Sequence, residues 1–281
     1  QNGVYRIHNI FSSYLRKLLE AQASGIMVDE LYRRAGQWHI QNGDIITGMK
    51  YFLKAGEYDL IMTEFEKSGI NLVMDNNPAY ILELFRQVPE EVKLRHPVGY
   101  LAYTGFYVTN VDKLAGEFLL SYIERHYRDD GSISGDMKRR ILGEIELIRA
   151  YIDFNDASSM KEKLERAHGM TGGRSFIANK DKIITFGSPH SLYLYYREKG
   201  RLSWTTRCVG EIFPYYMEMA GGCGKGFGDL LKGECCLETD DMEGAELNAY
   251  KAIYKARTMG QTSVIICAGF VLSRVYSARG K

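Results

Sequence analysis

The residue types best suited to binding a ligand stand close together in one short stretch of the 281-residue chain. An imidazole, two phenol rings and a guanidinium follow one another at His190, Tyr193, Tyr196 and Arg197. Aromatic rings accompanied by a few polar groups are typical of sites for small molecules and peptides. Aromatic residues at helical spacing also pack into protein cores, and that interpretation carries more weight. We therefore predict that this stretch either contacts a ligand or partner, or completes the core.

A glycine-rich stretch, GGCGKGFGD at residues 221–229, has some features of a phosphate-binding loop. Such a loop follows a β-strand and needs a serine or threonine directly after its Gly-Lys pair. Here Gly226 follows Lys225, and no strand is predicted before it. A linker between two helices is the better interpretation.

No other pattern indicates catalysis or a bound metal. The six histidines show no metal-ligand spacing, and the five cysteines include no CxxC pair, so free thiols in a reducing cytosol are expected. Ser188 in GSPHS does not match the G-x-S-x-G nucleophile motif. We therefore expect a cytoplasmic protein that is not an enzyme and whose chain holds no metal and no cofactor.

The charge of the chain is balanced, with 36 basic and 35 acidic residues. This balance argues against a broad nucleic-acid surface. Short basic clusters at residues 16–17, 33–34 and 138–140 have acidic neighbours, which favours solvated helix faces over DNA contacts. No apolar run approaches the roughly 18 residues of a membrane span, so no membrane contact is predicted.

The helices that must position these residues follow a recurring hairpin pattern. Residues 31–58 predict two helices, because apolar residues recur at helical spacing on both sides of a tight turn. Gly43 can adopt the positive φ of a helix C-cap, and the Asp44 carboxylate can cap the next helix. Gly36 and Gly48 are small enough to let the two helices approach closely. The spacing resembles a tetratricopeptide repeat, whose unit is about 34 residues.

The hairpin pattern recurs further along the chain. Asp112 lies 68 residues after Asp44, which corresponds to two repeat lengths. Gly233 stands eight residues before Asp241, as Gly36 does before Asp44. Thin hairpins of this kind bury their apolar faces by stacking on one another. We predict an all-α fold, a tetratricopeptide-like α-α superhelix that forms a right-handed solenoid of helical hairpins.

The repeat pattern is expected to break at about residues 171–201, where glycines and polar residues accumulate. Within this break, residues 183–186 predict a short extended piece and residues 191–197 a short helix. Two further loops are expected at residues 21–27 and 126–136.

Three phrases resemble the MalT-like large ATP-binding transcriptional regulators of the LuxR family. They are YRIHNIFSSYLRKLL at residues 5–19, RRAGQWHIQNGD at 33–44 with AGEYD at 55–59, and TFGSPHSLYLYYREKGRL at 185–202. In that family the first phrase leads out of a winged-helix segment and the second begins a helical-repeat region. The resemblance therefore implies that residues 1–28 are the end of the winged-helix segment with a linker helix, and that residues 29–281 are the repeat domain.

The resemblance also implies a function. Such regulators carry an N-terminal ATPase and a C-terminal helix-turn-helix, so we expect this chain to be a piece of a longer protein, with ATP and DNA bound only by modules outside it. The chain itself is then expected to bind a small-molecule effector, a protein or a peptide, and to contact the other domains or a second copy of itself. The hairpins alone leave an alternative, a scaffold that binds peptides or proteins without any small ligand.

Overall fold

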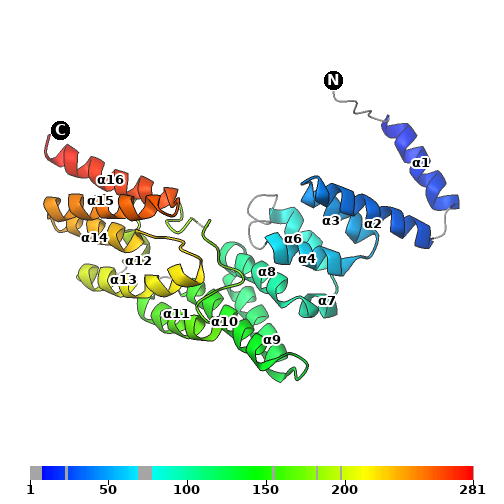
Figure 1. Cartoon of the computed structure of the whole chain (residues 1–281), viewed down its shortest axis with the longest axis horizontal. Helices are drawn as coiled ribbons and strands as arrows, with labels where there is room; N and C mark the ends of the chain where they lie inside the picture. The colour runs from blue at the N-terminus through cyan, green and yellow to red at the C-terminus, as the bar shows by residue number, and fades with distance from the viewer. Residues whose placement is uncertain are drawn as a thin grey trace. The chain divides into compact units, whose positions relative to one another are not determined.

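The structure is a computed structural model that describes residues 8–22, 25–68, 78–153, 156–181, 183–196 and 198–280. Within these ranges it contains fifteen helices and no strand (Figure 1), which confirms the prediction of an all-α fold. Neighbouring helices pack as antiparallel pairs. None of the described helices is both long enough and apolar enough to cross a membrane.

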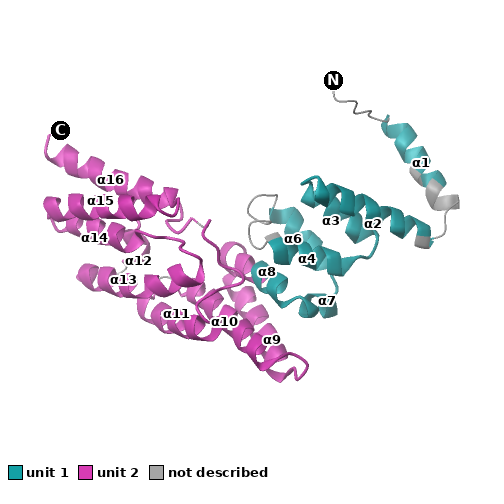
Figure 2. Cartoon of the chain, in the orientation of Figure 1, with its two compact units in different colours: residues 1–103 teal, residues 104–281 magenta. Residues whose placement is uncertain are grey.

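The chain forms two compact units, residues 1–103 and residues 104–281 (Figure 2). Unit 1 contains α1 (Asn9–Gln22), α2 (Gly25–Gln41), α3 (Ile45–Lys54), α4 (Tyr58–Ser68), α6 (Pro78–Gln87), α7 (Glu90–Arg95) and the first half of α8 (Pro97–Asn110). Unit 2 contains the second half of α8 and α9 (Lys113–Asp129), α10 (Gly135–Ile152), α11 (Ala157–Thr171), α12 (Leu192–Tyr195), α13 (Leu202–Met219), α14 (Phe227–Glu238), α15 (Met242–Arg257) and α16 (Thr262–Ala278).

Aspartate caps begin the second helix of three hairpins, as the sequence predicts for the first. The side chain of Asp44 accepts a hydrogen bond from the backbone N–H of Thr47 at 3.2 Å. Asp112 and Asp241 cap α9 and α15 in the same way, at 2.9 Å from the N–H groups of Ala115 and Gly244. Each cap satisfies a backbone donor that has no partner within its own helix.

Glycines lie where helices approach closely, as the sequence predicts for Gly36 and Gly48. A Cβ atom added at Gly36 would stand 2.5 Å from the ring of Phe52, which packs across the α2–α3 hairpin. A Cβ atom at Gly116 would stand 2.3 Å from the side chain of Val108. Both distances are far below van der Waals contact, so a larger residue would force the helices apart.

Unit 2 places the predicted break between two groups of helices. α10 packs against α9 and α11, α11 against α13, and α14 against α13, α15 and α16. The described residues between 172 and 201 are irregular apart from the four-residue α12, at the place where the sequence predicts a break in the repeats and a short helix. The buried carboxylate of Glu144 holds the first part of this segment, because it accepts hydrogen bonds from the Ser175 hydroxyl at 2.7 Å and the Phe176 N–H at 2.6 Å.

Three local predictions are wrong. Helices extend into both expected loops: α1 continues to Gln22 and α2 begins at Gly25, while α9 runs to Asp129 and α10 begins at Gly135. In α9 the last turn buries Tyr127, and this tertiary contact outweighs the polar composition of the segment. Residues 183–186 form turns instead of an extended piece, since no neighbouring strand in the described part of the chain offers hydrogen bonds to them.

The glycine-rich stretch at residues 221–229 connects α13 to α14, as expected of a linker between helices. Packing explains the glycine at Gly226, and a buried hydrogen bond holds the backbone at Gly224. Gly226 has a φ of 95°, and a Cβ atom there would lie 2.5 Å from the backbone oxygen of Ala252 in α15. The Gly224 N–H donates to the side chain of the buried Gln261 at 2.7 Å.

Candidate functional site

The described part of unit 2 contains a hollow of about 460 Å³ between α9, α10 and α11. Its lining combines three carboxylates, three cations and one apolar side chain, namely Glu117, Glu146, Asp153, Arg149, Lys163, Arg166 and Ile152. We call this the charged hollow. Its formal charge is balanced, and its volume lies within the range of small-molecule sites.

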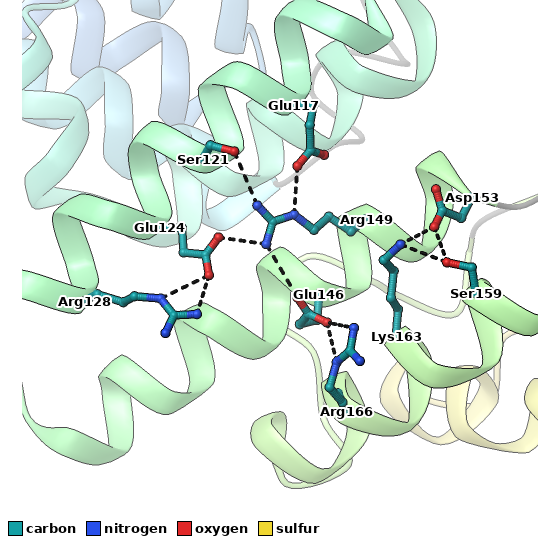
Figure 3. Close-up of polar contacts among 10 residues, drawn as sticks. All are labelled: Glu117, Ser121, Glu124, Arg128, Glu146, Arg149, Asp153, Ser159, Lys163 and Arg166. Carbon is teal, nitrogen blue, oxygen red and sulfur yellow. Dashed lines mark hydrogen bonds and ion pairs between the residues drawn. The ribbon is translucent and has the colours of Figure 1, made fainter.

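Each of the three helices contributes one polar face to the charged hollow and its border (Figure 3). The spacing of these residues along each helix is about one turn, so their side chains project from the same face. The faces consist of Glu117, Ser121 and Glu124 on α9, of Glu146 and Arg149 with the cap residue Asp153 on α10, and of Ser159, Lys163 and Arg166 on α11.

Arg149 is the centre of the contacts drawn in Figure 3. Its Nε donates to Oε1 of Glu117 at 3.0 Å, and its Nη1 lies 2.7 Å from Oε2 of Glu124 and 3.5 Å from Oε1 of Glu146. Its Nη2 donates to the Ser121 hydroxyl at 3.5 Å. The Arg149 side chain is only 17% exposed, so these charge-assisted contacts connect α9 and α10 away from bulk water.

The other two cations lie on α11. Arg166 donates through Nε to Oε2 of Glu146 at 2.7 Å, and half of its side chain is exposed. Lys163 contacts the carboxylate of Asp153 and donates to the Ser159 hydroxyl at 3.0 Å. Glu146 thus lies between Arg149 of its own helix and Arg166 of α11. It links the contacts of Arg149 with those of Arg166.

The electrostatics of the charged hollow favour the ionised forms. Burial alone raises the pKa of Glu124, but hydrogen bonds from Arg128 and Arg149 outweigh burial and leave the pKa below its ordinary value. Burial likewise raises the pKa of Asp153, and the hydrogen bond from Lys163 reverses this effect. Burial lowers the pKa of Arg149, whereas its bound carboxylates bring it above its ordinary value. The hollow therefore holds fixed charges of both signs near neutral pH.

Two of the residues singled out in the sequence, His190 and Tyr193, lie elsewhere in unit 2, against α14. His190 is 5% exposed, and its ring stacks on Tyr193 with centroids 4.0 Å apart. Its Nδ1 lies 3.6 Å from Oε2 of Glu234 and its Nε2 lies 3.3 Å from Oε1 of Glu238, without hydrogen-bonding geometry at either nitrogen. Arg274 of α16 approaches Glu238 at 3.2 Å. We call these five residues the His190 cluster.

Glu234 fixes the backbone beside His190. Its carboxylate is fully buried and accepts hydrogen bonds from the N–H groups of Ser191 at 2.8 Å and Leu192 at 2.6 Å. Burial raises the pKa of Glu234 to about 7, although these two hydrogen bonds act in the opposite direction. Burial also lowers the pKa of His190. Both shifts favour neutral side chains, the reverse of the charged hollow.

The structure brings together only part of the predicted set. Tyr193 adjoins His190 and remains 47% exposed, whereas the Tyr196 hydroxyl accepts a hydrogen bond from the Gly200 N–H at 3.2 Å and belongs to a local turn. Arg197 lies outside the described residues. His190 itself is buried.

Two of the basic clusters make local ion pairs. Arg33 and Arg34 both contact Glu30, at 2.7 Å and 2.8 Å, and Arg139 contacts Asp136 at 2.8 Å. Such pairing within one helix turn is typical of a solvated surface.

Sequence reasoning did not single out any residue of the charged hollow. Each helix face carries a local signal, since Glu117, Ser121 and Glu124 recur every three or four residues. The three faces converge only because α9, α10 and α11 pack together. Residue spacing within a single helix does not predict that packing.

Comparison of the chain with protein-family models, with curated proteins and with solved structures found no match.

Proposed function

We propose that this chain is the effector-sensing helical-repeat region of a MalT-like transcriptional regulator of the LuxR family. Its hairpins then form a right-handed tetratricopeptide-like solenoid, and its signal passes to ATPase and DNA-binding modules in the rest of the protein. The three phrases that resemble the family support this proposal. So do the antiparallel helix pairs and the aspartate caps, which recur at Asp44, Asp112 and Asp241.

The observation that carries the sensing role is the charged hollow. It is large enough for a small molecule, and its polar groups converge from three consecutive helices. A ligand held by α9, α10 and α11 together would favour one packing of these helices over others. It shifts the population of the regulator only to the extent that it binds that packing more tightly.

A thermal-shift screen of the 281-residue chain against sugars, amino acids, nucleotides and organic acids tests this function. An effector is expected to raise the melting temperature of the unmodified chain, and the variant Arg166→Gln should lose most of that shift. Arg139→Gln is the matched control, because Arg139 is an equally exposed arginine paired within its own helix. If no compound in the screen discriminates Arg166→Gln from the control, the charged hollow is not an effector site.

A second candidate function is a peptide- or protein-binding scaffold. An exposed apolar row on α9 favours it, since Leu114, Phe118 and Tyr122 are 69%, 69% and 43% exposed and lie four residues apart. A row with this spacing is one half of a helix-in-groove contact. The apolar row on α9 would bind the apolar face of an amphipathic helix, and the charged hollow would take no part in that contact.

Selection of binders from a displayed peptide library distinguishes the two functions. Peptides that bind the unmodified chain and Arg166→Gln equally, but that fail to bind Phe118→Ser, would support the scaffold. Circular dichroism should confirm that Phe118→Ser folds normally, because Phe118 is mostly exposed. If the selected peptides bind Phe118→Ser as well as the unmodified chain, the exposed row on α9 is not a peptide-binding site.

A further inference from the structure

We propose that the charged hollow binds a free α-amino acid, through its ammonium and carboxylate groups together. This inference rests on the proposed effector-sensing function and names the chemical class of the effector. It starts from the charge balance of the lining, in which three carboxylates and three cations, paired with one another, border a space of about 460 Å³.

A ligand of one sign is a poor match for this lining. An anion that took Arg166 from Glu146 would leave the Glu146 carboxylate, which is only 16% exposed, with fewer cationic partners. A cation that displaced Lys163 from Asp153 would leave the Lys163 ammonium group, which is 21% exposed, without its carboxylate partner. Leaving a charge largely buried and short of partners is costly, so both classes are disfavoured.

A zwitterion avoids this loss because it replaces both halves of an ion pair. Its carboxylate can take the place of Glu146 at Arg166, and its ammonium group can then take the place of Arg166 at Glu146. The number of charge-assisted contacts rises while no protein charge is left alone. An α-amino acid carries the two groups on one carbon, which matches the direct contact between these two side chains.

The solvent exposure of the lining side chains fits an exchange of this kind. Arg166 and Glu117 are 52% and 40% exposed, so both can turn toward a ligand from the border of the hollow. Arg149 is 17% exposed and contacts three carboxylates, so we expect its side chain to keep its position when a ligand binds. Ile152 supplies the one apolar surface for a ligand side chain.

Calorimetric titration and thermal shift of the 281-residue chain with single amino acids test the proposal. At about 100 times its Kd, the right amino acid should raise the melting temperature of unit 2 by about 5 to 10 °C. Its N-acetyl derivative and its amide, each of which lacks one charge, should bind at least about tenfold more weakly. Arg166→Gln should weaken binding about 10- to 100-fold, and Arg139→Gln should leave it unchanged.

The outcomes separate the ligand class from the function. A neutral or singly charged compound that depends on Arg166 would overturn the amino-acid assignment and leave the effector site in place. Equal binding of the amino acid and its blocked derivatives would also overturn the assignment. If amino acids and all other compounds fail to bind, or bind Arg166→Gln as well as the unmodified chain, both proposals fail.

Discussion

The charged hollow and the His190 cluster gather ionisable side chains in the same unit by opposite means. In the hollow each cation meets at least one carboxylate, and the pKa of Asp153, like that of Glu124 at the border, moves toward the ionised form. At Glu234 and His190 in the cluster, burial outweighs pairing, so the pKa of Glu234 rises and that of His190 falls, whereas at the more exposed Glu238 burial is outweighed and the pKa is lowered. The first arrangement keeps charge available for exchange with a ligand. The second uses a buried carboxylate to hold the chain.

The contrast is one of solvent access as much as of composition. Arg166 at the border of the hollow is half exposed, and so it can change partners at little cost. Glu234 is fully buried and bonded to two backbone N–H groups, so any change there disturbs the packing of residues 191–192 against α14. We therefore assign binding to the hollow and structural support to the cluster.

The largest effect is expected from Arg149→Ala. This change leaves Glu117, Glu124 and Glu146 without their shared cation, and it should lower the free energy of unfolding of unit 2 by about 3 kcal/mol. Urea unfolding followed by circular dichroism measures the loss. Arg139→Ala should change stability by less than about 0.5 kcal/mol. A loss at Arg149 no greater than this control would show that the ion pairs do not stabilise the helix contacts.

The two regions should respond to pH in different windows. The pKa of Glu234 rises from 4.5 to about 7 on folding, so its contribution to stability is fully present below about pH 4.5 and is lost as the pH rises toward 7. The loss amounts to at most about 3 kcal/mol. The pKa of Asp153 is lowered, so its contribution is present above its ordinary value of 3.8 and is lost on further acidification.

Stability measured against pH for the unmodified chain and for Glu234→Gln tests this difference. The variant cannot ionise, so its curve should be flatter between about pH 4.5 and 7 and should keep the loss at acid pH. Parallel curves for the two proteins would contradict the assignment of the neutral-pH window to Glu234.

Glu234→Ala should have a smaller effect at neutral pH, about 2 kcal/mol of unfolding free energy. The substitution leaves the N–H groups of Ser191 and Leu192 without their acceptor, while it also removes the cost of a buried carboxylate. Hydrogen exchange should become faster at these two amides. If exchange there is unchanged, the carboxylate does not hold this segment.

The smallest effect is expected from Tyr193→Ala, below about 1 kcal/mol, because the Tyr193 ring is half exposed, so the variant loses its stacking on His190 and a hydrogen bond to Glu238 at the border with solvent. Tyr193→Phe keeps the ring and should be closer to the unmodified chain. Chemical denaturation of the unmodified chain, Tyr193→Ala and Tyr193→Phe measures the order of their unfolding free energies. A cost above about 2 kcal/mol for the alanine variant would place Tyr193 in the core of the cluster.

The features that were predicted correctly from the sequence are local ones. The caps of Asp44 and the turn at Gly43 depend on neighbouring residues, and the spacing of Gly36 reports a close helix contact directly. The ends of helices were predicted less well, since α9 continues past its polar residues to bury Tyr127. Tertiary packing decides such ends.

The sites follow the same rule. His190 and Tyr193 lie three residues apart in the sequence, so their proximity is a local feature. Glu234 and Arg274 join them from helices far along the chain, and the three faces of the charged hollow meet only through packing. A list of residue types cannot report such contacts.

The most direct test of this assignment is calorimetric titration of any effector into the unmodified chain, Arg166→Gln and Tyr193→Ala. We expect Arg166→Gln to lose at least about tenfold in affinity and Tyr193→Ala to bind as the unmodified chain does. Loss of binding in Tyr193→Ala with full binding in Arg166→Gln would contradict this assignment and would move the ligand site to the His190 cluster.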